Sequence, residues 1–93
     1  MKREKIEFAF IVDKDAHSYL IEVVNHMMNF FGISQEEAIE RINRGFAGME
    51  VVGSPEENWL YYEMPEDQAK FIYYEVGTYW WIEGSPLKPK PYP

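Results

Sequence analysis

Residues 13–31 read DKDAHSYLIEVVNHMMNFF, and this stretch decides the fold. Asp13 and Asp15 are both good N-cap residues, and the stretch is followed by Gly32, a residue typical of helix C-termini. At roughly 100° per residue, the polar side chains fall on one narrow arc and the apolar ones fall on the wide remainder. The apolar set comprises Ala16, Leu20, Val23, Val24, Met27, Met28, Phe30 and Phe31. A helix with so broad an apolar side is contacted from several directions, so we predict that it forms the centre of the core.

A second helix begins at a capping box, Ser34-x-x-Glu37, and runs to about Arg44. Glu37 and Arg41, and likewise Glu40 and Arg44, are spaced as i,i+4 ion pairs in the favoured order. Both arginines also lie in the last turn, where the helix dipole favours cations. The side chains predicted to face inward are Ala38, Ile39, Ile42 and Phe46.

Short strands are predicted on either side of the two helices. Residues 49–52 and 58–63 are rich in β-forming side chains, and the turn-forming residues 53–57 lie between them. This spacing predicts an antiparallel hairpin. Residues 6–12 alternate weakly and favour another strand, with a helical lead-in as the alternative.

A third helix is predicted to begin at Pro65, which suits the first helical position. It would run over residues 65–76 and end before Gly77. The alternative is a strand at 71–76 that turns into a second strand at 79–83, because Phe, Ile, Tyr and Val favour strands.

The predicted fold class is α+β, with about three helices packed on a small antiparallel sheet. A length of 93 residues leaves room for a single core. We expect a basic N-terminal tail over 1–5, one globular domain over 6–84 and a Pro-rich C-terminal tail over 85–93. The helices are expected at about 14–31, 35–45 and 65–76 and the strands at 49–52 and 58–63, with 79–83 and 6–12 as further candidates.

The charge distribution argues against nucleic acid or an anionic membrane as the main partner. The formal net charge is −7, and basic residues concentrate at the two ends of the chain. Between Ile6 and Leu87, 15 acidic and four basic residues leave a charge of −11. Affinity for nucleic acid comes largely from Lys and Arg, so this body would repel a phosphate backbone. A heterologous protein partner should therefore be basic.

No segment predicts secretion or membrane insertion. The apolar run at 6–12 is short, is interrupted by Glu7 and lacks a small-residue cleavage site, which argues against a signal peptide. The longest charge-free run, from Val23 to Gln35, is too polar to span a membrane. Cysteine is absent, which excludes a disulfide framework and a thiolate nucleophile, and we expect a cytoplasmic protein.

Sequence signatures of catalysis and metal binding are absent. The chain contains no G-x-S-x-G, Walker A, G-x-G-x-x-G, H-E-x-x-H or calcium-loop pattern. His17 and His26 would point to opposite sides of one helix and cannot share a metal. We therefore expect no cofactor, no metal and no catalytic residue. The alternative is a small-molecule-binding protein or enzyme with a pocket around His17, Tyr61 or Tyr62, and Glu63.

The distinctive feature of the sequence is its aromatic density, because nine aromatic residues fall between positions 59 and 81. A small core cannot enclose them all, since each buries about 150–250 Å². On a strand, Trp80 and Trp81 would face opposite ways and differ in burial. Either the surplus rings form a second layer under the Pro-rich tail, or they form a Tyr/Trp surface rimmed by acids, which is typical of protein interfaces. The predicted partner-binding residues are Trp59, Tyr61, Tyr62, Glu63, Tyr74, Tyr79, Trp80 and Trp81.

A series of short motifs runs through residues 30–83. In order, they are Ser34-x-Glu36-Glu37-Ala38, Arg41-Ile-Asn43, Tyr62-Glu63-x-Pro65, Ala69-x-x-Ile72-Tyr73-Tyr74 and Trp80-Trp81. This series resembles a family of small bacterial domains of unknown function, and the resemblance implies no activity, cofactor or catalytic residue. In size and charge the chain is also similar to toxin-immunity proteins, which act by binding.

The sequence thus favours a non-catalytic binding protein over an enzyme. We predict that it engages another protein, or a second copy of itself, through the aromatic and acidic surface.

Overall fold

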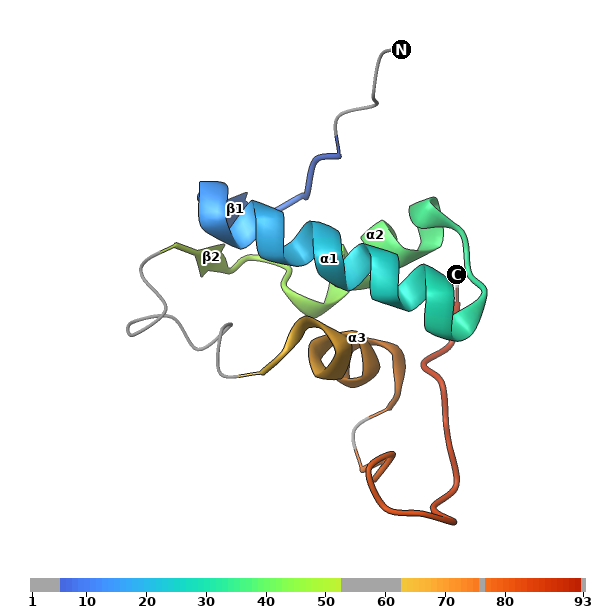
Figure 1. The fold of residues 1–93 in the computed structure, drawn as a ribbon. Coiled ribbons are helices and arrows are strands. Elements are labelled where there is room, and N and C mark those ends of the chain that lie inside the picture. The colour runs from blue at the N-terminus through green and yellow to red at the C-terminus, as the bar shows by residue number, and fades with distance from the viewer. Residues whose placement is uncertain (1–5, 53–62, 76, 93) are drawn as a thin grey trace.

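The computed structural model describes residues 6–52, 63–75 and 77–92. Within these ranges the chain forms three helices and a small two-stranded sheet, in the order β1, α1, α2, β2, α3 (Figure 1). Their bounds are Ile11–Val12 for β1, Lys14–Phe31 for α1, Gln35–Gly45 for α2, Glu50–Val51 for β2 and Pro65–Tyr73 for α3. The predicted α+β class is confirmed.

The first helix, α1, forms where the sequence predicted it. The Asp13 side chain caps it and accepts a hydrogen bond from the Ala16 N–H at 2.9 Å. Gly32 ends it with a left-handed backbone (φ 64°), and its N–H donates to the Met28 carbonyl. This conformation favours glycine, because a β-carbon would strain it.

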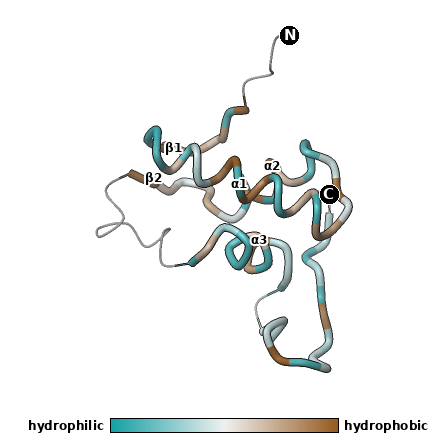
Figure 2. The backbone as a smooth tube through the Cα atoms, in the orientation of Figure 1, coloured by the Kyte–Doolittle hydropathy of each residue, from teal (hydrophilic) through white to brown (hydrophobic). Residues whose placement is uncertain are grey.

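The core lies around α1, which packs against both α2 and α3. Figure 2 shows that hydrophobic residues line the middle of α1. The buried core side chains of the three helices include Leu20, Val23, Val24, Met27, Ala38, Ile42, Ala69 and Ile72. Two inferences about α1 need correction: Phe30, assigned to the apolar arc, is 46% exposed, and Tyr19, left out of it, is buried.

The capping box predicted for α2 is confirmed. The Ser34 hydroxyl accepts a hydrogen bond from the Glu37 N–H at 3.0 Å. Both predicted ion pairs form, from Arg41 to Glu37 at 2.8 Å and from Arg44 to Glu40 at 2.7 Å. The capping box and the ion pairs that predicted this helix each involve residues within about one helical turn, so the prediction did not depend on tertiary contacts.

The sheet is parallel, so the predicted antiparallel sheet is wrong. Ile11 pairs with Glu50 and Val12 with Val51, and both strands run the same way. The direction follows from the chain path. In the sequence, α1 and α2 come between the two strands, and the second helix brings the chain back to the end of the sheet where β1 began. Within the predicted strand 6–12 only Ile11–Val12 is a strand. The predicted hairpin partner at 58–63 lies outside the described residues except for Glu63.

The third helix, α3, begins at Pro65 as predicted but ends at Tyr73 rather than before Gly77. Tyr74 leaves the helix in an extended conformation and forms an isolated antiparallel bridge with Pro89. A distant segment therefore sets the end of this helix. The alternative strand at 71–76 is wrong for residues 71–73, which are helical.

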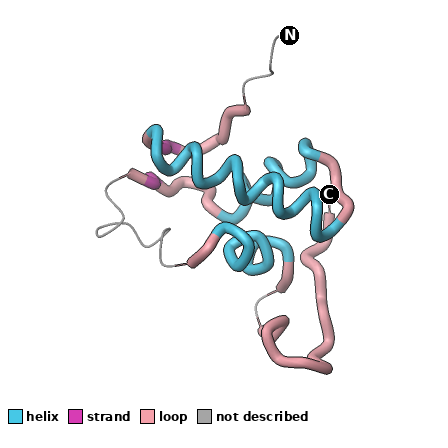
Figure 3. The backbone as a smooth tube through the Cα atoms, in the orientation of Figure 1, coloured by secondary structure: helices cyan, strands magenta, loops and turns pink. Residues whose placement is uncertain are grey.

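The C-terminal part of the chain has little regular structure and still packs on the helices. Figure 3 shows no helix or strand in the described residues after α3, so the predicted strand at 79–83 is wrong. The Glu75 N–H donates to the Lys88 carbonyl, and the Lys90 N–H donates to the Tyr73 carbonyl, each at 2.8 Å. Residues 85–92 are extended and return to α2 (Figure 1).

Tyr19 connects α1 to the segment that leads into α3. Its hydroxyl donates to the Glu63 carbonyl at 2.6 Å, across 44 positions of the sequence. Burial raises the pKa of Tyr19 to about 12, with a smaller contribution from the negative charge of Glu63. The neutral phenol is therefore the form that the folded chain retains.

Replacing the capping residue tests the start of α2. Ser34→Ala should lower the free energy of unfolding by about 1 kcal/mol, because the Glu37 N–H loses its acceptor. Urea denaturation of both proteins measures the change. Ser18→Ala, at an exposed position within α1, is the matched control and should change stability by less than about 0.5 kcal/mol. Equal midpoints for wild type and Ser34→Ala would contradict the cap.

Alkaline pH tests the buried phenol. The folded state keeps Tyr19 protonated up to a pKa of about 12, whereas the unfolded chain ionises it at the ordinary value of 10.0. The contribution of this raised pKa is thus complete below pH 10 and is lost between about pH 10 and 12. In denaturation experiments across this range, Tyr19→Phe should lose stability less steeply than wild type. Parallel curves for the two proteins would contradict the assignment.

Candidate functional site

Four aromatic side chains gather beside α3 and form what we call the aromatic cluster: Phe71, Tyr79, Trp80 and Trp81. The ring centroids of Trp80 and Trp81 are 5.2 Å apart, and those of Phe71 and Trp80 are 5.4 Å apart. Tyr79 reaches Trp81 at 5.5 Å. These three pairs meet edge to face, the arrangement that the ring quadrupoles favour.

Turns after α3 bring this cluster together. Gly77 has a left-handed backbone (φ 92°), and the Thr78 N–H donates to the Glu75 carbonyl at 3.1 Å. The Ile82 N–H then donates to the Tyr79 carbonyl at 2.9 Å, which closes a second turn. The chain folds back on the end of α3, so residues from the turns contact Phe71 on the helix.

The aromatic cluster is largely exposed. Trp81 is 56% exposed, Tyr79 is 53% exposed and Phe71 is 43% exposed, while Trp80 is half-buried. Ile82, beside them in the sequence, is also exposed. Single exposed apolar side chains are ordinary, but a contiguous group of large aromatic side chains marks a candidate interaction surface.

Lys70 links the cluster to α1. Its Nζ lies 4.9 Å from the ring centroid of Trp80 and 5.2 Å from that of Phe30. Both distances are within the range of cation–π attraction. The lysine therefore lies between the half-buried indole of Trp80 and Phe30 of α1.

The half-buried indole of Trp80 leaves its N–H group without a hydrogen bond among the described residues. The Nε1 atom of this group is buried. Leaving a buried donor unpaired costs about 1–3 kcal/mol. The cluster is thus packed less favourably than an ordinary interior.

A cavity of about 180 Å³ opens beside the aromatic cluster. Tyr74 and Lys70 line it together with the four rings of the cluster. Glu75 also lines it, and this side chain is exposed. The cavity therefore combines flat apolar walls with one cation and one anion.

The structure brings together only some of the predicted partner-binding residues. Tyr79, Trp80 and Trp81 share the aromatic cluster, and Tyr74 lines its cavity. Trp59, Tyr61 and Tyr62 lie outside the described residues. Glu63 lies before α3 and offers its backbone carbonyl to Tyr19.

The burial of the two tryptophans differs, as predicted, but for another reason. Trp81 is exposed and Trp80 is half-buried. Both lie in turns rather than on a strand, so strand alternation does not cause the difference. Both rings contact Phe71, but Trp80 is additionally covered by the Lys70 ammonium, 4.9 Å from its centroid.

The structure describes two of the residues predicted for the alternative pocket, His17 and Glu63. The His17 Nε2 lies 2.6 Å from the Ile6 carbonyl, which can only accept, so the nitrogen donates. A surface hollow of about 460 Å³ involves His17 and the N-terminal residues, but Glu63 does not line it. Tyr62, the third member, lies outside the described residues.

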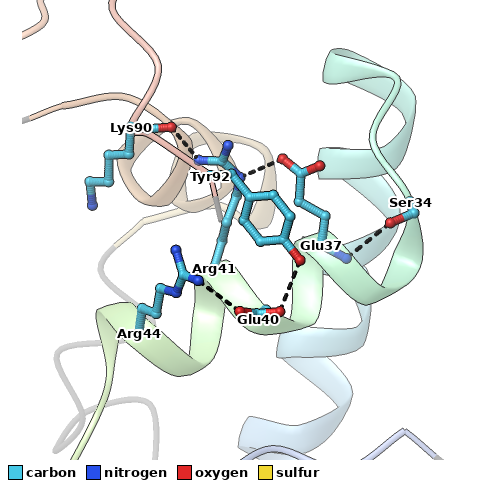
Figure 4. A network of polar contacts seen from close by, with 7 residues as sticks. All are labelled: Ser34, Glu37, Glu40, Arg41, Arg44, Lys90 and Tyr92. Atoms are coloured by element: carbon cyan, nitrogen blue, oxygen red, sulfur yellow. Dashed lines mark hydrogen bonds and ion pairs between the residues drawn. The ribbon is translucent and has the colours of Figure 1, made fainter.

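A polar network that the sequence did not reveal fixes the C-terminal segment to α2 (Figure 4). Arg41 is buried, and it donates to the Glu37 carboxylate at 2.8 Å and to the Lys90 carbonyl at 2.9 Å. Its guanidinium also lies over the rings of Tyr73, at 4.7 Å, and Tyr92, at 5.3 Å. One arginine thus joins α2, α3 and the tail.

Tyr92 completes this network from the end of the chain. Its hydroxyl donates to the Glu40 carboxylate at 2.9 Å. This hydrogen bond raises the pKa of Tyr92 and lowers the pKa of Glu40, and the bond from Arg44 further lowers the latter. The sequence signals for Arg41 and Arg44 indicated only helix-surface ion pairs, and nothing in the spacing indicated a contact with residue 92.

Within the described residues, 6–52, 63–75 and 77–92, no group of three or more His, Cys, Asp or Glu side chains is arranged to hold a metal ion. None of the helices there is long and apolar enough to cross a membrane.

Comparisons with known proteins add no relative. No protein-family model, no curated protein and no solved structure matches the chain. The resemblance to a family of small bacterial domains therefore stays a prediction.

Replacing Arg41 tests how the C-terminal segment is held. Arg41→Lys keeps the charge but cannot bond Glu37 and the Lys90 carbonyl through one planar fork. We expect a loss of about 1–2 kcal/mol in the free energy of unfolding, the value of one or two hydrogen bonds. Amide exchange of the Lys90 N–H should also accelerate. Arg44→Lys is the control, because Arg44 is exposed and its ion pair contributes little. Unchanged Lys90 exchange in Arg41→Lys would refute the role.

Proposed function

We propose that this protein is a non-catalytic binding protein that engages another protein through the aromatic cluster. The observation that carries this proposal is the exposure of Tyr79, Trp81 and Phe71 in one contiguous group of rings. Aromatic residues of this kind are enriched at the centres of interfaces, where they combine a large contact area with few rotatable bonds.

The energetic state of the cluster supports the same proposal. Trp80 keeps an unpaired buried N–H, and Trp81 keeps more than half of its surface in water. A partner that covers these rings would remove apolar area from water at about 25 cal/mol per Å². Association would therefore be favoured without any rearrangement of the core.

The charge of the chain supports a basic partner. The net charge is −7, and Glu75 and Glu83 are exposed near the cluster in sequence. Opposite charge on the partner would speed association and make it sensitive to salt. A second copy of the chain is a different outcome, in which the rings of two molecules cover each other.

Replacing Trp81 tests the proposed surface. Trp81→Ala should leave the free energy of unfolding within about 1 kcal/mol of wild type, because the side chain is mostly exposed. It should weaken association by about 2 kcal/mol or more if Trp81 is an interface anchor. Sedimentation velocity measures self-association. Affinity capture with wild-type and variant baits, followed by titration of the purified partner at two salt concentrations, measures heterologous binding.

Met49→Ala is the control, because Met49 is an exposed apolar side chain outside the cluster. It should bind like wild type. A monomeric wild type for which every captured protein also binds Trp81→Ala equally would refute the proposal.

A further inference from the structure

The cavity beside the aromatic cluster has the chemistry of a cation site. Five aromatic residues line it, and the flat rings of Tyr79 and Trp81 are the most exposed of them. The face of an aromatic ring carries negative electrostatic potential, which attracts ammonium and guanidinium groups. A volume of about 180 Å³ is large enough to receive the end of one long side chain.

Two cations within the chain already lie over such rings. The Lys70 ammonium lies over Trp80 at 4.9 Å and over Phe30 at 5.2 Å. The Arg41 guanidinium lies over Tyr73 at 4.7 Å. Neither of these cations is placed over Trp81 or Tyr79.

Glu75 supplies an anion at the edge of the same cavity. Its backbone N–H donates a hydrogen bond to the Lys88 carbonyl, whereas its side chain is exposed and makes no ion pair with a described residue. A carboxylate beside aromatic faces can accept two parallel hydrogen bonds from a guanidinium. The cavity thus offers both a stacking surface and an acceptor.

We propose that this cavity receives an arginine side chain of a basic partner protein. The guanidinium stacks on the exposed ring of Trp81, with the edge-on ring of Tyr79 beside it, and the Glu75 carboxylate accepts its hydrogen bonds. Arginine fits better than lysine because its guanidinium is planar, weakly hydrated and able to form two parallel bonds. The inference rests on the proposed function, since it names the group by which the partner is recognised.

Lys70 opposes this binding and makes a further test possible. Its ammonium lines the same cavity, so it repels a second cation there. The excess of acidic side chains on the chain outweighs one lysine at long range, because the net charge is −7. Removing the Lys70 charge should therefore strengthen arginine binding. If the cavity instead bound an anion, removing this charge would weaken binding.

The experiment titrates the full-length protein with the peptide acetyl-Gly-Arg-Gly-amide and follows the indole N–H signals of Trp80 and Trp81 by NMR. The matched control peptide has citrulline in place of arginine, which has nearly the same shape without the charge. We expect saturable shifts with the arginine peptide and binding roughly five-fold or more weaker with the citrulline peptide.

Variants locate the binding within the cavity. Glu75→Gln should weaken arginine binding about three- to ten-fold, and Lys70→Met should strengthen it. Glu83→Gln is the matched control, because Glu83 is an exposed acid that does not line the cavity. It should leave the affinity within about two-fold of wild type.

Three results would overturn the inference: equal binding of the arginine and citrulline peptides, no effect of Glu75→Gln, or tighter binding of acetyl-Gly-Glu-Gly-amide, which would make this an anion site at Lys70. The proposed function fails separately. If Trp81→Ala abolishes protein association while the arginine peptide does not bind, the binding surface stands and only its recognition of arginine is wrong.

Discussion

Burial of the broad apolar side of α1 is the constraint on which the rest of the structure depends. Leu20, Val23, Val24 and Met27 are almost completely enclosed, and each such side chain contributes about 1.5–3 kcal/mol when it leaves water. The sheet joins only two residues from each strand, so it cannot organise a core by itself. The helices α2 and α3 are instead placed by their contacts with α1. Through α3, this packing also determines where the aromatic cluster lies.

Local signals explain how much of the fold the sequence could predict. The caps at Asp13 and Ser34 and the helix start at Pro65 each depend on a few neighbouring residues, and each prediction is confirmed. Strand direction depends on the path of the chain, so the parallel pairing of β1 and β2 was missed. The end of α3 depends on backbone bonds to Lys88 and Lys90, which no periodicity near Tyr73 could reveal.

The candidate site was predictable in composition but not in geometry. The density of aromatic residues indicated that some of them would be exposed, and Tyr79 and Trp81 are. Their arrangement comes from turns after Gly77 rather than from a strand, and their contact with Phe71 needs the turn to fold back on α3. The buried position of Arg41 was hidden for a different reason: its spacing from Glu37 is the same as that of an ordinary surface pair.

The long sequence separations of the C-terminal contacts bear on how the protein is made. Glu40 and Tyr92 meet across 52 positions, and Arg41 and Lys90 across 49, whereas α1 and α2 are adjacent along the chain. On the ribosome, the first two helices can associate as soon as they emerge, because closing a short loop costs little entropy. We expect Arg41 to lack its contacts with Lys90 and Tyr92 until residues 88–92 have been synthesised and have left the ribosomal exit tunnel. A nascent chain that pauses after α3 would therefore expose this arginine, without its C-terminal partners, to chaperones.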